Sequence, residues 1–168
     1  MRIEITKHAR DDAIRIVRDD GSQAVTRFAK KGPVPHDAVH FFVERGLGLT
    51  DAFWGKIAAG AHPEALAAMA KAAGHASASR AGDPDRSIVE LLQAERLVEC
   101  FEAELWNMPS DADDAGLIAM ATTACAASRV PLPKLNPAAL AAIRAPLGTF
   151  VTAWSAAPQG HVAVFDWD

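Results

Sequence analysis

Three side chains able to hold a metal ion stand four residues apart in the sequence: His36, His40 and Glu44. They lie in the segment P-H-D-A-V-H-F-F-V-E, residues 35–44, which we expect to be helical because Pro35 suits a first turn. Steps of four residues drift by only about 40° around a helix, so the side chains form one slanting stripe. Two histidines at this spacing can direct ring nitrogens at one ion. A divalent metal such as zinc, held by His36, His40 and Glu44, is therefore one hypothesis.

A metal at this stripe would supply hydrolytic chemistry. Three protein ligands leave a coordination position for water, whose lowered pKa makes it a nucleophile. Asp37 follows His36 in the place of the glutamate in the H-E-x-x-H motif of metalloproteases. Aspartate is one methylene shorter than that glutamate, which limits its reach as a general base. Asp37 is the candidate catalytic residue, and Glu64 is a downstream carboxylate in the region where such enzymes place a third ligand.

The same stripe also suits a structural role. It runs beside the apolar arc of the same helix, formed by Val39, Phe42, Val43 and Leu47. Histidines in such a position often bond a backbone group or a carboxylate, and His40 with Glu44 makes a good i,i+4 pair. The sequence therefore leaves two hypotheses open for the stripe: a metal site, or a buried hydrogen-bond network without metal.

Other residues give weaker indications of chemistry. Gly46 and Gly48 end the expected helix, whereas a phosphate-binding loop opens a helix after a strand. The serines follow no G-x-S-x-G pattern, so nothing supports a serine hydrolase. Cys100 is a conceivable nucleophile, yet it lies between Val98 and Phe101 in an expected helix, as inert core cysteines do.

The bulk composition limits the classes of protein to which this chain can belong. Its 168 residues carry a net charge of −4, so we expect one domain over residues 1–168 and no nucleic-acid partner. The two cysteines form no C-x-x-C pair, which indicates reduced, buried thiols. The N-terminus resembles no signal peptide, and no run approaches the roughly 18 apolar residues of a membrane span. We expect a cytoplasmic protein without a membrane partner.

Hydrophobic periodicity predicts an α+β fold. Alternation of apolar and polar residues predicts strands at 2–6, 13–18, 23–29 and 161–167. The intervening chain has helical spacing and caps over about five segments, of which the longest begins at Ser87; Pro146 should break or kink the last. Residues His75 to Arg86 are small, polar and broken by proline, which predicts a mobile surface loop. The expected architecture is a small antiparallel sheet, an N-terminal meander plus a C-terminal strand, covered by about five helices.

Three segments together resemble a group of uncharacterised bacterial proteins that begin with a hairpin followed by P-H-D-x-x-H-F. They are residues 35–44, the run F-W-G-K-I-A-A-G-A at 53–61, and the pattern W-x-x-x-P-x-G-H-V-x-V from Trp154. The resemblance implies a shared fold and a bacterial origin. The group has no known activity, so the resemblance implies no function.

These observations lead to two functional hypotheses. The favoured one is a non-catalytic binding or interaction module that forms a homo-oligomer. A dimer is favoured because alanine-rich helices permit close packing and symmetric dimers are the commonest oligomers. The alternative is a divalent-metal-binding protein, with hydrolysis as its activity, that uses His36, His40 and Glu44. Neither hypothesis indicates which small molecule is bound.

Overall fold

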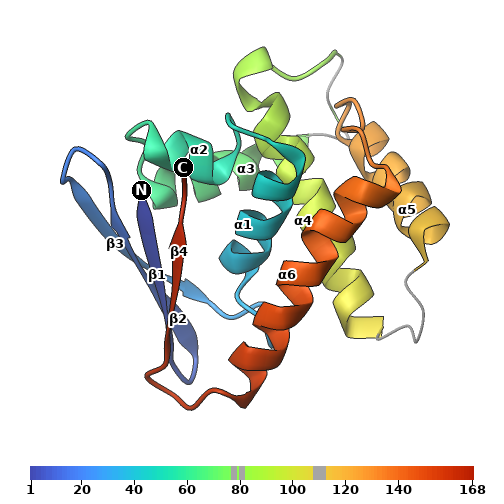
Figure 1. Ribbon diagram of the computed structural model, residues 1–168. Coiled ribbons are helices and arrows are strands. Elements are labelled where there is room, and N and C mark those ends of the chain that lie inside the picture. The colour runs from blue at the N-terminus through green and yellow to red at the C-terminus, as the bar shows by residue number, and fades with distance from the viewer. Residues whose placement is uncertain (77–78, 80–81, 108–112) are drawn as a thin grey trace.

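A computed structural model describes residues 1–76, 79, 82–107 and 113–168 of the chain (Figure 1). Over these residues it shows a four-stranded antiparallel sheet and six α-helices, so the predicted α+β class is confirmed. The strands lie in the order β3-β2-β1-β4, which places the last strand beside the first. Their bounds are Arg2–Lys7 (β1), Asp11–Val17 (β2), Gln23–Ala29 (β3) and Val162–Asp166 (β4).

One face of the sheet is apolar and buried. Ile3 and Ile5 of β1 pair with Ile16 and Ile14 of β2, and all four side chains are at most 1 % exposed. The predicted third strand is confirmed, but it turns Thr26 inward and leaves Val25 63 % exposed. Of its two larger apolar residues, Phe28 packs against the core and Val25 faces outward, which accounts for the missing strict alternation.

Six helices pack against the buried face of the sheet and against each other. Their bounds are His36–Leu47 (α1), Phe53–Ala58 (α2), Pro63–Ala76 (α3), Val89–Asn107 (α4), Asp114–Ala127 (α5) and Pro137–Ala156 (α6), with a short 3₁₀ turn at Arg86–Ile88 (η2) before α4. The longest is α6 with 20 residues, against 19 for α4. Of the break or kink expected at Pro146, the break is not found, because α6 continues through this residue. Of the expected loop at 75–86, residues 77, 78, 80 and 81 lie outside the described part of the chain.

Helix α1 lies at the centre of the fold, between the sheet and the helices α4 and α6 (Figure 1). Phe41 joins the apolar cluster under the sheet, together with Trp54 of α2. Val39 and Val43 join a second cluster with α4, α5 and α6. Because α1 is covered on several sides, its polar side chains must find partners within the protein. Within the described residues, no helix is long and apolar enough to cross a membrane.

Candidate metal centre

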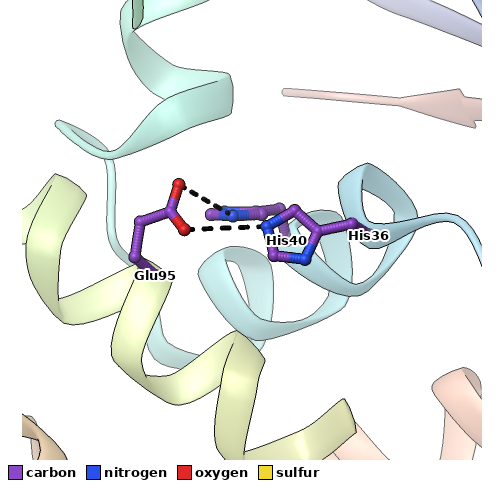
Figure 2. Close-up of side chains that lie close together, drawn as sticks. All are labelled: His36, His40 and Glu95. Atoms are coloured by element: carbon purple, nitrogen blue, oxygen red, sulfur yellow. Dashed lines mark ion pairs between the residues drawn. The ribbon is translucent and has the colours of Figure 1, made fainter. Parts of the chain in front are cut away.

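Helix α1 places the two histidines next to each other. It begins after Pro35 in an extended conformation and ends at Gly48, whose φ of 66° allows the left-handed turn that closes the helix. His36 and His40 lie one helical turn apart, with ring centroids 4.9 Å from each other and planes at 72°. Both rings are turned toward helix α4 (Figure 2).

Glu95 of α4 supplies the carboxylate that faces both rings (Figure 2). Its Oε2 lies 3.6 Å from His36 Nε2, and its Oε1 lies 3.6 Å from His40 Nε2. In the part of the chain that the structure describes, these three residues form the one group whose ligand atoms all lie within 4.8 Å of one another.

The distances in this group suit a bridging ion better than direct contact. A separation of 3.6 Å is longer than a hydrogen bond. Two ligand atoms at about 2.1 Å from a tetrahedral zinc ion are about 3.4 Å apart, close to the observed spacing. In addition, His36 Nε2 is buried without a hydrogen-bond partner among the described residues. The two pairs that involve Glu95 thus have the spacing of ligands to one ion, and all three ligand atoms lie within 4.8 Å of one another.

The other nitrogen of each ring is held by a carboxylate. His36 Nδ1 lies 3.0 Å from Glu102 Oε1, and His40 Nδ1 lies 2.9 Å from Glu44 Oε1. A carboxylate that accepts the Nδ1 proton fixes the ring orientation and leaves the lone pair of the neutral ring on Nε2. This pairing is usual for histidines that bind metal, and here both histidines have it.

Glu44 therefore does not occupy the place expected from the sequence. Its side chain is fully buried on the Nδ1 side of His40, while Glu95 lies on the Nε2 side. Its second oxygen accepts the backbone N–H of Trp54 at 2.9 Å. Both oxygens thus have partners, and the carboxylate grouped with the two histidines is that of Glu95. The expected i,i+4 pair of His40 with Glu44 is confirmed.

The remaining candidates lie in different surroundings. Asp37 is buried in the first turn of α1, where burial raises the pKa of its carboxyl group. Glu64 accepts a hydrogen bond from Thr26 at 3.0 Å and is not part of the metal-ligating group. Cys100 is buried in α4, and desolvation raises the pKa of its thiol to about 11. It is therefore protonated at neutral pH and unsuited as a nucleophile.

The carboxylates around the histidines favour protonated rings when no metal is bound. Burial by itself lowers the pKa of His40, but Glu44 and Glu95 outweigh it and raise this pKa to about 10. Burial likewise opposes the effect of Glu102 and Glu95 on His36, whose pKa is also raised. A metal ion must displace these protons from Nε2, so metal and protons compete for the same cluster.

The three residues line a cavity of about 740 Å³ between β3, α1, α3 and α4. An ion held there would be accessible to a small molecule in the cavity, which is large enough for an organic ligand. Besides the three residues, the charged side chains of its wall are Asp12, Lys30, Lys31, Asp37, Lys71, Arg96 and Glu99.

Sequence reasoning missed Glu95 and Glu102, although the sequence carried a signal for both. They share a helical face with Leu91 and Val98, which are fully buried. Carboxylates at core-facing positions of an amphipathic helix need buried partners. That pattern identifies residues which must meet other polar groups, but it does not say which ones.

In comparisons with known proteins, no protein family, no curated protein and no solved structure matches this chain. The chemistry of the site therefore has to be argued from its own geometry.

Proposed function

We propose that this chain is a divalent-metal-binding protein whose ligands are His36 Nε2, His40 Nε2 and the Glu95 carboxylate. The observation that carries the proposal is the paired orientation of the rings. Each ring has a carboxylate on Nδ1, at 3.0 or 2.9 Å, and turns Nε2 to one shared carboxylate at 3.6 Å. A hydrogen-bond network without metal accounts for the short contacts at Nδ1. His36 Nε2, by contrast, is buried without a hydrogen bond and faces the Glu95 carboxylate only at the longer distance of 3.6 Å.

The ligand set favours a metal with catalytic rather than purely structural use. Two histidines and one carboxylate occur in zinc hydrolases and in iron(II) enzymes, and both leave a position for water or substrate. A bound zinc ion would lower the pKa of its water to about 7. Hydrolysis is therefore the activity that we propose for the metal-loaded protein.

Asp37 is the proposed acceptor of the proton from that water. Of the cavity carboxylates, Glu95 is assigned to the metal, Asp12 pairs with Lys30, and Glu99 pairs with Arg96. Asp37 has no ion-pair partner within the described residues and lines the same cavity.

The bacterial origin, the cytoplasmic location and the homodimer expected from the sequence remain proposals. Light scattering would test the homodimer.

The test measures metal content and affinity in matched variants. The purified protein is stripped with a chelator, loaded with Co²⁺ or Zn²⁺, and analysed by plasma mass spectrometry and by Co²⁺ absorption. We expect about one equivalent of metal in the natural protein and at least about 100-fold weaker binding in Glu95→Gln. Glu99→Gln is the control, because Glu99 lines the same cavity from the same helix but is not in the ligand group. Equal metal content in all three proteins, or none in any, would overturn the proposal.

A further inference from the structure

The wall of the metal-site cavity carries charges of both signs. It carries four cationic side chains, Lys30, Lys31, Lys71 and Arg96, and four carboxylates, Asp12, Asp37, Glu95 and Glu99. These charges do not all act on a ligand, because several are already neutralised within the wall.

Two of the cations are used in ion pairs. Lys30 Nζ lies 3.3 Å from Asp12 Oδ1, and Arg96 Nη1 lies 2.9 Å from Glu99 Oε2. By contrast, Lys31 and Lys71 form no ion pair with any described residue, and both side chains belong to exposed residues at the wall. Among the described residues, Asp37 is the one wall carboxylate outside these pairs besides Glu95, and Lys31 acts on it electrostatically. With Glu95 bound to a divalent ion, two lysines and the remaining charge of the ion face this one carboxylate, so the net charge of the cavity is positive.

Arg96 provides a further unused donor. It follows the proposed ligand Glu95 directly, and its Nε is buried without a hydrogen-bond partner among the described residues. Guanidinium groups with free donors bind carboxylate and phosphoryl oxygens well. A buried donor that the protein leaves unpaired is costly unless a ligand or water accepts from it.

The rest of the wall is apolar. Phe28 of β3 and Phe53 of α2 line the cavity, together with Ala67 and Ala70 of α3. Phe53 also contacts the ring of His40, with centroids 5.4 Å apart, so this apolar surface reaches the proposed metal. An organic body can therefore pack beside the ion, while its charged end meets the cationic part of the wall.

From this arrangement we infer that the cavity binds an organic oxyanion, a molecule with a carboxylate or phosphoryl group and an apolar body. The acid group lies between the metal ion and the cations Lys31 and Lys71, and the body packs against Phe28 and Phe53. The inference rests on the proposed metal site and deepens it by naming the class of ligand. Both acid groups share the same chemistry, and the experiment distinguishes them.

The test uses Co²⁺-loaded protein and three aromatic probes. Benzoate and phenyl phosphate carry the two acid groups, and benzamide is the neutral counterpart of benzoate. Binding is followed by the change in Co²⁺ absorption. We expect at least one acid to bind about tenfold or more tightly than benzamide, because two unpaired cations and the ion attract it. The tighter of the two acids identifies the acid group.

The lysines are tested by Lys31→Gln/Lys71→Gln. This variant should keep its Co²⁺ and bind the preferred acid about tenfold more weakly, since it lacks two charges of the wall. Lys56→Gln/Lys134→Gln is the control, because it removes the same charge from residues that do not line the cavity and should bind the acid as the natural protein does.

The outcomes separate the inference from the proposed function. If the natural protein holds no Co²⁺, the metal site is wrong and the inference fails with it. If Co²⁺ binds but the acids and benzamide bind equally, the metal site stands and the oxyanion inference is overturned. If acids are preferred but the lysine variant binds them unchanged, the ion alone attracts them and the role of Lys31 and Lys71 is overturned.

Discussion

Helix α4 takes part in two clusters of charged side chains that differ in one respect. The first, here the α1–α4 cluster, consists of His36, His40, Glu44, Glu95 and Glu102. The second, here the α4–α6 cluster, consists of Glu104, Asp114 and Arg144. In the α4–α6 cluster every contact is direct. In the α1–α4 cluster, the groups around Glu95 stand apart.

In the α4–α6 cluster, the guanidinium group and both carboxylates bind one another directly. Arg144 donates from Nε and Nη2 to both oxygens of Glu104, at 2.9 and 2.6 Å, and from Nη1 to Asp114. This is the paired geometry in which guanidinium and carboxylate groups bind most strongly. The Asp114 side chain is 42 % exposed, so water can also solvate the cluster. No further ligand is needed there.

The α1–α4 cluster does not satisfy itself in the same way. Its three carboxylates outnumber its two imidazoles, and the side chains of His40 and Glu44 are only 2 % and 0 % exposed. With neutral rings the cluster would hold three largely buried carboxylates, so it needs protons, on the rings or on a carboxyl group such as Glu44, whose pKa burial raises, or a metal ion. The 3.6 Å separations at Glu95 are where we propose that the ion binds. The two clusters therefore differ in spacing rather than in the mere presence of charge.

The largest effect should come from adding zinc. At a free Zn²⁺ concentration 100 times the Kd, binding should raise the free energy of unfolding by about 2.7 kcal/mol. For a chain of this size that corresponds to a rise in Tm of about 5–11 °C. Differential scanning calorimetry with buffered Zn²⁺ measures it. His36→Asn/His40→Asn should show no rise, whereas Arg144→Gln, which alters only the α4–α6 cluster, should show the full rise. The same rise in both variants would mean that zinc binds elsewhere.

The next effect distinguishes the ligand from the residue that orients it. Glu44→Gln and Glu102→Gln replace the carboxylate that bonds the Nδ1 atom of His40 or His36 by a neutral amide, and they leave the three proposed ligands in place. Each should therefore lower Co²⁺ affinity by about 10–100-fold. The shape of the Co²⁺ absorption spectrum should remain that of the natural protein. Chelator competition gives the affinity. If Glu44→Gln instead changed the spectrum and abolished binding as Glu95→Gln does, Glu44 would be the ligand, as its spacing on α1 first indicates.

The choice between Glu44 and Glu95 also shows what the sequence can predict about the site. Four-residue spacing on α1 is local, so it correctly joins His40 to Glu44. Glu95 comes from another helix, and periodicity within a segment carries no information on which helices meet. Local spacing therefore identified the histidines, but the carboxylate that we propose as third ligand, Glu95, lies on the other side of the His40 ring from Glu44.

The sequence also predicted the fold only in part. Alternation predicts the inward face of β1 and β2, because isoleucines occupy four of the buried positions there; the remaining buried residue of β2 is Asp12. On β3 the inward face holds Thr26, whose hydroxyl bonds Glu64, beside Phe28, whereas Val25 is exposed, so the apolar residues of this strand do not alternate strictly. Pro146 was expected to interrupt α6, but losing one backbone hydrogen bond does not end a helix that packs through Ile143 and Leu147.

A smaller effect should follow from opening the α4–α6 cluster. Arg144→Met removes the cation that holds Glu104 and Asp114, whose side chains are 16 % and 42 % exposed. Partial exposure places the expected loss between that of surface and buried pairs, at about 1–3 kcal/mol in the free energy of unfolding. Urea denaturation measures this loss. Zn²⁺ affinity should stay within about twofold of the natural value, because no ligand is touched. A large loss of affinity would mean that the two clusters are coupled through α4.

The smallest effect concerns Cys100, which lies on α4 near both clusters and should be activated by neither. Burial raises the pKa of its thiol to about 11, with Cys125 and Glu99 adding to the shift. In the folded Cys125→Ala variant, thiolate absorbance should appear only above about pH 10, whereas the urea-unfolded chain should titrate near its ordinary pKa of about 8.5. Because the folded form keeps its proton longer, stability should be complete below about pH 8.5 and fall as the pH rises toward 11. Thiolate in the folded protein at pH 7–8 would instead show that a nearby cation stabilises it, and would restore Cys100 as a candidate nucleophile.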